Sequence, residues 1–186
     1  GATGDLAYKK IFPALQHMLR RDSLDVPVLI VSGDISLDGK SDLLWRHAGT
    51  GADQIWLSAS KATSKAVTQV TSQAWKMVGI GDFNADGYSD ILWRNTTTGA
   101  NTIWKSASSA SVQATTTVAS QSWKVVGVGD FDNNGASDIL WRNISGAVSV
   151  WLMNGTTFSS IAGLPTVTDT NWQIVGVGNM DGVGGP

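Results

Sequence analysis

The chain has 186 residues, of which 42% are hydrophobic and 15% are charged, and its formal net charge is −2. This composition excludes a disordered chain, and the lack of a basic excess argues against binding to nucleic acid. No apolar run reaches the ~18 residues that a membrane span needs. The absence of cysteine excludes disulfides and thiolate metal sites. All 15 acidic residues are Asp, which prefers turns to helix interiors, so we expect few helices.

The first 27 residues do not share the pattern of the remainder and are predicted to form a separate helical segment. The apolar residues Leu6, Ile11, Leu15 and Leu19 recur at a spacing that favours one short helix. The chain begins at Gly1 without an initiator Met, which predicts a fragment of a longer polypeptide.

The opening string Gly-Ala-Thr-Gly-Asp-Leu-Ala-x-Lys-Lys-Ile-x-Pro-Ala-Leu resembles the nucleotide-binding start of glucose-6-phosphate dehydrogenases. The resemblance implies that Gly1, Gly4, Asp5 and Leu6 match the NADP-binding turn and that Lys10 matches the active-site lysine. The strand that should precede this turn and the catalytic Arg-Ile-Asp-His-Tyr motif of that family are missing from the sequence. We therefore expect a remnant of an NADP-dependent dehydrogenase without activity.

From about residue 28 onward, the sequence repeats with a period of 48 residues, which is one residue longer in the last copy. A strand-like phrase, Trp-Lys-x-Val-Gly-x-Gly, begins at Trp75 and Trp123 and recurs with Gln for Lys at Trp172. All nine Trp fall at three positions of the unit, which are occupied by Trp45, Trp93 and Trp141, by Trp56, Trp104 and Trp151, and by Trp75, Trp123 and Trp172.

Each unit contains about four short segments rich in β-branched and aromatic residues, separated by Gly, Asn and Thr turns. Four strands in roughly 40–50 residues are typical of a β-propeller blade. The sequence therefore predicts an all-β fold of propeller blades over residues 28–186, with three repeats of about 48 residues and a partial fourth. Residues 28–33 are predicted to form the first strand of the first blade.

A loop with alternating oxygen-bearing side chains follows the first strand of each unit. Positions 1, 3, 5 and 9 carry Asp, Asn or Ser, position 6 is Gly, and position 7 offers its backbone carbonyl. Calcium accepts six to eight such oxygens in a flexible geometry, whereas magnesium demands a tighter octahedron. The candidate calcium ligands are Asp34, Ser36, Asp38, Lys40 and Asp42; Asp82, Asn84, Asp86, Tyr88 and Asp90; and Asp130, Asp132, Asn134, Ala136 and Asp138.

The charges of these loops also favour a cation. Nine of the 15 Asp lie in the three loops, and three carboxylates within nine residues repel one another unless a cation neutralises them. An EF-hand is excluded, because it needs a bidentate Glu and the chain has no Glu. The alternative is that Asp, Asn and Gly only form a tight turn between strands.

The phrase Val-Gly-Asp-Phe-Asn-x-Asp-Gly-x-x-Asp-Ile, followed by a Trp-containing strand, resembles the FG-GAP/VCBS repeats of integrin-α-type β-propellers over residues 28–186. The resemblance implies a structural calcium ion in each loop and an extracellular or cell-surface location. The first loop departs from the pattern at Ile35 and Ser36, so we expect a weaker site there. The fourth copy, at residues 179–183, stops before the position-9 acid and is expected to bind poorly.

The expected function is a non-catalytic, calcium-binding module for interaction with a protein or a glycan, because no nucleophile–base pair or pair of general acids is evident. The alternative is a lectin-like module in which the repeated Trp side chains stack on sugars. The competing interpretation of these Trp is a core between blades. Arg46, Arg94 and Arg142 follow a Trp each time and are expected to pair with Asp or backbone carbonyls.

The number of units sets an expectation for the assembly. A closed propeller has 4–8 blades, and about three and a half units are too few to close. The chain is therefore expected to be an open fragment, a part of a longer propeller, or a homodimer that completes roughly seven blades.

Overall fold

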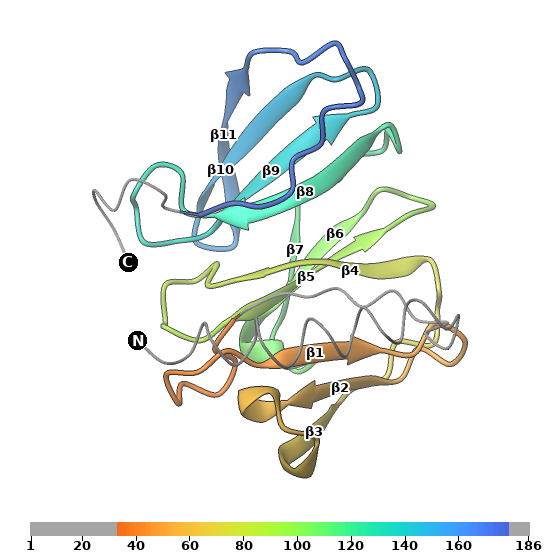
Figure 1. Ribbon diagram of the computed structural model, residues 1–186, viewed down its shortest axis with the longest axis vertical. Helices are drawn as coiled ribbons and strands as arrows, with labels where there is room; N and C mark the ends of the chain where they lie inside the picture. The colour runs from red at the N-terminus through yellow and green to blue at the C-terminus, as the bar shows by residue number, and fades with distance from the viewer. Residues whose placement is uncertain (1–32, 179–186) are drawn as a thin grey trace.

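The computed structural model describes residues 33–178, and within them the fold is all-β, as predicted. Three antiparallel sheets are stacked face to face (Figure 1). Sheet 1 contains β1 (Leu43–Arg46), β2 (Asp53–Trp56) and β3 (Ser64–Val67). Sheet 2 contains β4 (Trp75–Gly81), β5 (Asp90–Asn95), β6 (Asn101–Trp104) and β7 (Val112–Thr115). Sheet 3 contains β8 (Trp123–Gly129), β9 (Asp138–Asn143), β10 (Val148–Asn154) and β11 (Thr157–Leu164).

Several predictions from the sequence lie outside the described residues. They are the N-terminal helix, the dehydrogenase-like segment, most of the first strand of the first unit, and the truncated fourth loop at residues 179–183. Within residues 33–178 the sheets form an open stack, and no closed ring is present. No helix in this part of the chain has the length and apolar character of a membrane span.

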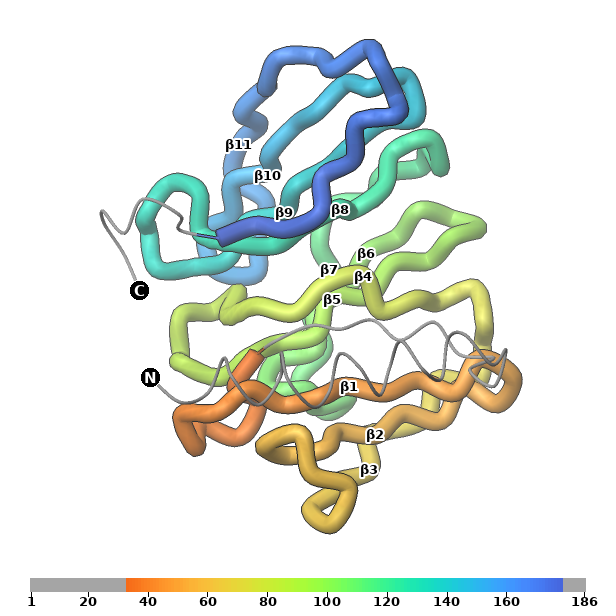
Figure 2. Tube along the Cα trace, viewed as in Figure 1, coloured from red at the N-terminus to blue at the C-terminus, as the bar shows by residue number. Residues whose placement is uncertain are grey.

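Each sheet is an up-and-down meander in which the strands pair in chain order (Figure 2). Asn and Gly at the hairpins allow short connections: Asn95 Oδ1 accepts the N–H groups of Thr97 and Thr98, and Gly99 adopts a positive φ of 77°. The 3₁₀ turns η2 (Leu57–Ala59) and η3 (Lys61–Thr63) lead from β2 to β3, and η4 (Lys105–Ala107) leads from β6 to β7. Local turn chemistry thus accounts for the repeated topology.

The core lies between the sheets, because successive side chains of a strand point to opposite faces. On β5, Ile91 and Trp93 pack toward sheet 1, whereas Leu92 packs toward sheet 3. Both clusters contain residues that are at most 1% exposed, including Ile91, Trp93, Leu92 and Trp141. The interpretation of these two Trp as core residues is therefore confirmed.

The repeated Arg connects each sheet to the next. Arg46 and Arg94 each lie 5.0 Å from the ring centroid of the Trp in the following sheet, Trp93 and Trp141 respectively. This is within the range of a cation–π interaction. Arg46 also donates to both carboxylate oxygens of Asp53 at 3.0 Å. The expectation that these two Arg pair with an Asp or with carbonyls is confirmed.

In Arg94 the carboxylate partner is replaced by an amide. Its Nη1 donates to Asn101 Oδ1 at 3.2 Å. Its Nη2 donates to Val118 O at 2.9 Å, as Arg46 Nη2 donates to Val70 O at 2.7 Å. Arg94 is only 3% exposed, and this burial lowers the pKa of its guanidinium.

Glycine in the first strand permits the close approach of neighbouring sheets. A Cβ at Gly81 would lie 2.5 Å from Ser137 Oγ and 2.7 Å from Val128 Cγ1 of sheet 3. The same approach recurs one sheet earlier, where a Cβ at Gly33 would lie 2.8 Å from Ile80 Cγ2. These positions are thus required by packing between sheets.

We therefore expect Gly81→Ala to lower the free energy of unfolding by about 1–3 kcal/mol, because the added methyl group overpacks the interface between sheets 2 and 3. Gly163→Ala is the matched control, since Gly163 has no atom within 4 Å of its Cβ position and no positive φ. Urea unfolding followed by tryptophan fluorescence measures both variants. Equal stability of the two would contradict the packing argument.

Candidate metal-binding loops

The loops predicted to bind calcium lie together along one edge of the stack. Loop 1 (residues 34–42) precedes β1, loop 2 (residues 82–90) follows β4, and loop 3 (residues 130–138) follows β8. In each loop the position-1 carboxylate accepts backbone N–H groups of the loop itself. Oδ1 accepts from position 5 at 3.2 Å and Oδ2 from the position-6 glycine at 2.6 to 2.9 Å. These carboxylates belong to Asp34, Asp82 and Asp130.

The loop that these hydrogen bonds close requires left-handed backbone at two positions. Position 4 has a φ near +60° in each loop, at Leu37, Ala85 and Asn133, and the position-6 glycine has a φ between 75° and 88°. Glycine adopts such values without the steric cost that a side chain adds. The alternation seen in the sequence therefore folds into the same wrapped loop three times.

The position-9 aspartates Asp42, Asp90 and Asp138 are buried, at most 1% exposed, and have a role that the sequence did not indicate. Each carboxylate accepts two backbone N–H groups from different parts of its unit. Oδ2 accepts from position 2 of the loop at 2.8 to 3.0 Å. Oδ1 accepts from Ser58 or Ser106 in a 3₁₀ turn, or from Met153 near the end of β10, at 2.7 to 2.8 Å.

The turn at Ser58 and Ser106 was not predicted from the sequence, although a repeated sequence pattern marks it. Ser58 and Ser106 both follow a Trp at the same interval, within the repeated string Ser-Ala-Ser. Both have a positive φ, of 51° and 49°, which turns their N–H groups toward the buried carboxylate. In sheet 3 the same donor position is taken by Met153, at the end of a longer β10.

The position-9 carboxylates lie in an environment that disfavours their ionised form and would be relieved by a nearby positive charge. Burial raises the pKa of Asp90 to about 6, and the neighbouring carboxylates of Asp86 and Asp82 add to the rise. Burial also raises the pKa of Asp138, to which Asp132 and Asp130 contribute in the same way. A cation bound among these groups would favour their ionised forms.

The carboxylate oxygens lie closest together in loop 3. Oxygens of Asp130, Asp132 and Asp138 lie within 4.8 Å of one another, and within residues 33–178 no other group of three acidic or His side chains meets this distance. The set combines two exposed carboxylates and one buried carboxylate. All three are oxygen donors of the kind that calcium takes, so these residues fit the ion.

Loop 2 contains a buried side-chain oxygen without a hydrogen-bond partner. Asn84 Oδ1, at position 3, is buried and has no hydrogen-bond partner, while its Nδ2 donates to Asp86 Oδ2 at 2.8 Å. A buried acceptor without a partner carries a desolvation cost. A cation between Asn84 and the neighbouring carboxylates would remove that cost, so this loop also fits the ion.

In loop 1 the corresponding side chains are engaged with hydroxyl groups. Asp38 Oδ2 accepts from Ser58 Oγ at 2.7 Å, and this hydrogen bond holds the pKa of Asp38 below its usual value. Ser36 Oγ lies 3.5 Å from Asp34 Oδ1. Lys40 Nζ lies 3.5 Å from Asp38 Oδ2 and adds a positive charge at the loop. These contacts compete with a cation.

The position-7 residues Lys40, Tyr88 and Ala136 donate their backbone N–H groups to the position-5 side chain at 2.8 to 2.9 Å. Their side chains are thus not needed for the loop geometry. The role predicted for their carbonyls as calcium ligands stays a prediction.

Neighbouring loops also contact each other. Ser89 N, at position 8 of loop 2, donates to Asp34 O at 3.1 Å, and Ser137 N donates to Asp82 O at 2.7 Å. The position-2 side chain reinforces this contact: Phe83 is fully buried in the cluster between sheets 2 and 3. Phe131, in the last described loop, is 43% exposed. The three loops therefore form one hydrogen-bonded row.

Comparison with known families supports the interpretation of the repeat. Residues 82–141 match the FG-GAP-like repeat family. The match extends from the first residue of loop 2 through loop 3 and most of β9. No curated protein and no solved structure matches the chain.

We expect Asp90→Ala to lower the free energy of unfolding by about 2–5 kcal/mol, because two buried N–H groups lose their acceptor. The loss should persist in excess chelator, since these hydrogen bonds do not involve a metal. Asp169→Ala, an exposed aspartate outside the loops, is the control. Urea unfolding in chelator tests this prediction, and a variant as stable as the control would refute the structural role of Asp90.

Proposed function

We propose that the chain is a non-catalytic, calcium-stabilised repeat module that presents its surface to a protein or glycan partner outside the cell. The observation that carries the calcium proposal is the group formed by Asp130, Asp132 and the buried Asp138. The FG-GAP-like repeat matched by residues 82–141 supports an interaction module. Extracellular calcium, at millimolar concentration, suits weak loops of this kind.

The contacts of the individual loops support an order of affinity. Loop 3 offers three converging carboxylates, loop 2 offers the unpartnered Asn84 Oδ1, and loop 1 has its Asp38 carboxylate engaged by Ser58 and Lys40. We therefore propose that calcium binds most tightly in loop 3 and least tightly in loop 1. Since the loops bond to the neighbouring sheet, bound calcium would stabilise the stack as well as the loop.

Calcium should raise the stability of the protein measurably. With a dissociation constant of ~0.1 mM, millimolar calcium adds about 1.4 kcal/mol per site, so three sites add roughly 4 kcal/mol, or about 8–16 °C in Tm. Differential scanning calorimetry with calcium and with chelator measures the difference. Identical melting curves would contradict the calcium proposal.

Asp132→Asn tests metal binding separately from folding, because Asp132 accepts hydrogen bonds only from Asn134 within its own loop. This variant should match the wild type in chelator and lose about 1.4 kcal/mol of the calcium-dependent stabilisation. Asp169→Asn should behave as the wild type in both conditions. A full calcium response in Asp132→Asn would remove loop 3 from the proposal.

A second candidate function, carbohydrate binding, is favoured by two equivalent pockets of about 250 and 220 Å³. The first is lined by Val70, Trp75, Trp93, Thr102, Trp104 and Val112. The second is lined by Val118, Trp123, Trp141, Ser149, Trp151 and Ile161, which are the corresponding residues of the next repeat. Indole rings stack on the apolar faces of sugars, and one hydroxyl group in each pocket can bond a sugar hydroxyl.

Trp104→Ala and Trp151→Ala test the carbohydrate proposal. If a glycan occupies these pockets, each variant should weaken its binding about tenfold or more, in line with the loss of 1–3 kcal/mol for a stacking contact. Leu164→Ala is the control, because Leu164 is an apolar side chain that is 45% exposed and lines neither pocket. The wild type is screened first on a glycan array. If it binds no glycan, the carbohydrate proposal is refuted and the proposal of a protein partner remains.

A further inference from the structure

Two pockets recur at equivalent places in successive repeats, and a buried donor without an acceptor lines each of them. They are the pockets of about 250 and 220 Å³ introduced above, which we call the Trp pockets. Trp93 lines the first and Trp141 lines the second, and both side chains are 1% exposed. The indole Nε1 of each has no hydrogen-bond partner in the described part of the chain. A buried N–H group without an acceptor costs free energy, so an occupant that brings an acceptor would stabilise the pocket.

The rings of these two Trp are already engaged by other side chains. The guanidinium of Arg46 lies 5.0 Å from the ring centroid of Trp93, and the ring of Trp104 lies 5.1 Å away at an angle of 46°. The same arrangement recurs around Trp141 in the second pocket. The group that Trp93 and Trp141 still have free for an occupant is therefore the indole N–H.

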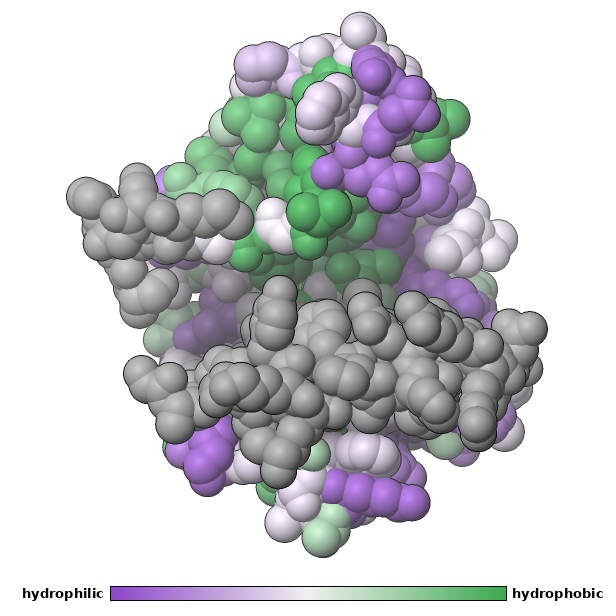
Figure 3. All heavy atoms as spheres, viewed as in Figure 1, coloured by the Kyte–Doolittle hydropathy of each residue, from purple (hydrophilic) through white to green (hydrophobic). Residues whose placement is uncertain are grey.

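The remaining lining of the Trp pockets is apolar apart from one hydroxyl group. Thr102 supplies this hydroxyl in the first pocket and Ser149 in the second, and every other described lining residue is Trp, Val or Ile. On the face shown in Figure 3, hydrophobic residues gather over sheet 3, which forms most of the second pocket. A sugar carries several hydroxyl groups, and each one that is buried needs a partner. The lining therefore favours an occupant that is apolar except for a single acceptor.

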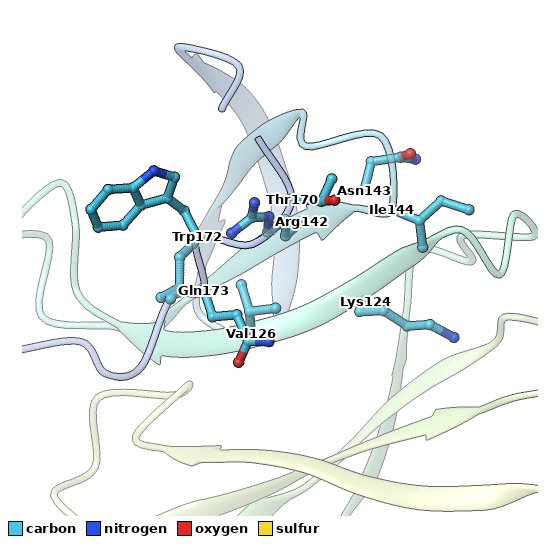
Figure 4. Close-up of a pocket in the computed structure, with 9 residues that line it drawn as sticks. Lys124, Val126, Arg142, Asn143, Ile144, Thr170, Trp172 and Gln173 are labelled. Carbon is cyan, nitrogen blue, oxygen red and sulfur yellow. The ribbon is translucent and has the colours of Figure 1, made fainter. Parts of the chain in front are cut away.

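Another pocket of the protein has a different chemistry. It has a volume of about 370 Å³, lies between β8, β9 and residues 170–174, and is lined by the cationic Lys124 and Arg142 together with Trp172 (Figure 4). Charged side chains thus line a pocket elsewhere on this protein, whereas the described lining of both Trp pockets contains none. This difference points to an uncharged occupant of the Trp pockets.

We propose that each Trp pocket binds a proline from a polyproline II segment of a protein partner, and that the indole N–H of Trp93 or Trp141 donates to a peptide carbonyl of that segment. This inference rests on the proposed function and names the chemistry of its protein partner. A proline ring is apolar and brings no N–H group. The carbonyls of a polyproline II helix are free, because the helix has no internal hydrogen bonds. Grooves lined by aromatic side chains bind such preformed segments at a low entropic cost.

The repetition of the pocket also fits a ligand that has its own repeat. The two pockets belong to successive sheets, and stacked sheets lie about 10 Å apart. One turn of polyproline II contains three residues and rises about 9 Å. Prolines three residues apart therefore match successive pockets, and a segment that occupies both binds more tightly than one that occupies a single pocket.

Fluorescein-labelled decaproline is the probe, and a Gly-Ser peptide of the same length is its control. In fluorescence anisotropy, the full chain should bind decaproline saturably and should not bind the Gly-Ser peptide. Trp93→Phe keeps an aromatic ring and removes the N–H group, so it should weaken the binding of decaproline about three- to tenfold. Trp172→Phe is the matched control, because it removes an indole N–H that is 70% exposed and outside both Trp pockets.

Two variants at the rims of the pockets leave the core unchanged. Val112 lines the first pocket and is 48% exposed, and Ile161 lines the second and is 61% exposed. Val112→Ser and Ile161→Ser should each weaken the binding of decaproline about fivefold, because each removes apolar contact area from one pocket. Leu164→Ser is the control, since Leu164 is 45% exposed and lines neither pocket.

The outcomes separate this proposal from the proposed function. No binding of decaproline by the wild type, wild-type affinity in Trp93→Phe, or equal affinities of the rim variants and Leu164→Ser would each overturn the proline proposal. A glycan that binds in the Trp pockets where decaproline does not would also overturn it, and would leave the second candidate function in place. The calcium dependence of Tm is measured without any peptide, so its failure would contradict the calcium proposal alone.

Discussion

The buried aspartate at position 9 is the interaction on which each repeat depends. In sheet 2 its two oxygens accept N–H groups from the loop and from a turn 16 residues further along the chain, and so hold these two segments together. Without this carboxylate, two buried donors would lack an acceptor. The same carboxylate also faces the other acids of its loop, which raise its pKa. One residue thus links the stability of the sheet to the electrostatics of the candidate metal loop.

The joining of sheets follows from the alternation of side chains along the second strand. One face carries Ile and Trp and the other carries Leu and Arg, so the Arg face of each sheet meets the Trp face of the next. Such an interface is directional, because each sheet presents its Trp on one face and its Arg on the other.

The row of candidate metal loops along one edge also joins the sheets. Each loop backbone bonds to the preceding loop through Ser89 or Ser137, and Phe83 fills the interface beneath them. Under the calcium proposal, a cation that orders one loop would also order its contact with the next. The loops differ in their contacts, since Asp38 is engaged by a hydroxyl and Asn84 Oδ1 has no partner. Such differences suit a graded response to calcium.

The period of 48 residues, the all-β class, the loops with their glycine turns and the repeated Trp positions could all be predicted from the sequence, because turn chemistry and strand patterns are local. The sequence did not reveal that Asp42, Asp90 and Asp138 are buried acceptors, because their donors at Ser58, Ser106 and Met153 lie 15 or 16 residues away. It set loop 1 apart through Ser36, but it did not separate loop 2 from loop 3, whose ligands are similar in type. Which carboxylates converge and which Trp meets which Arg became evident from the tertiary structure alone, since both depend on how one sheet packs against the next.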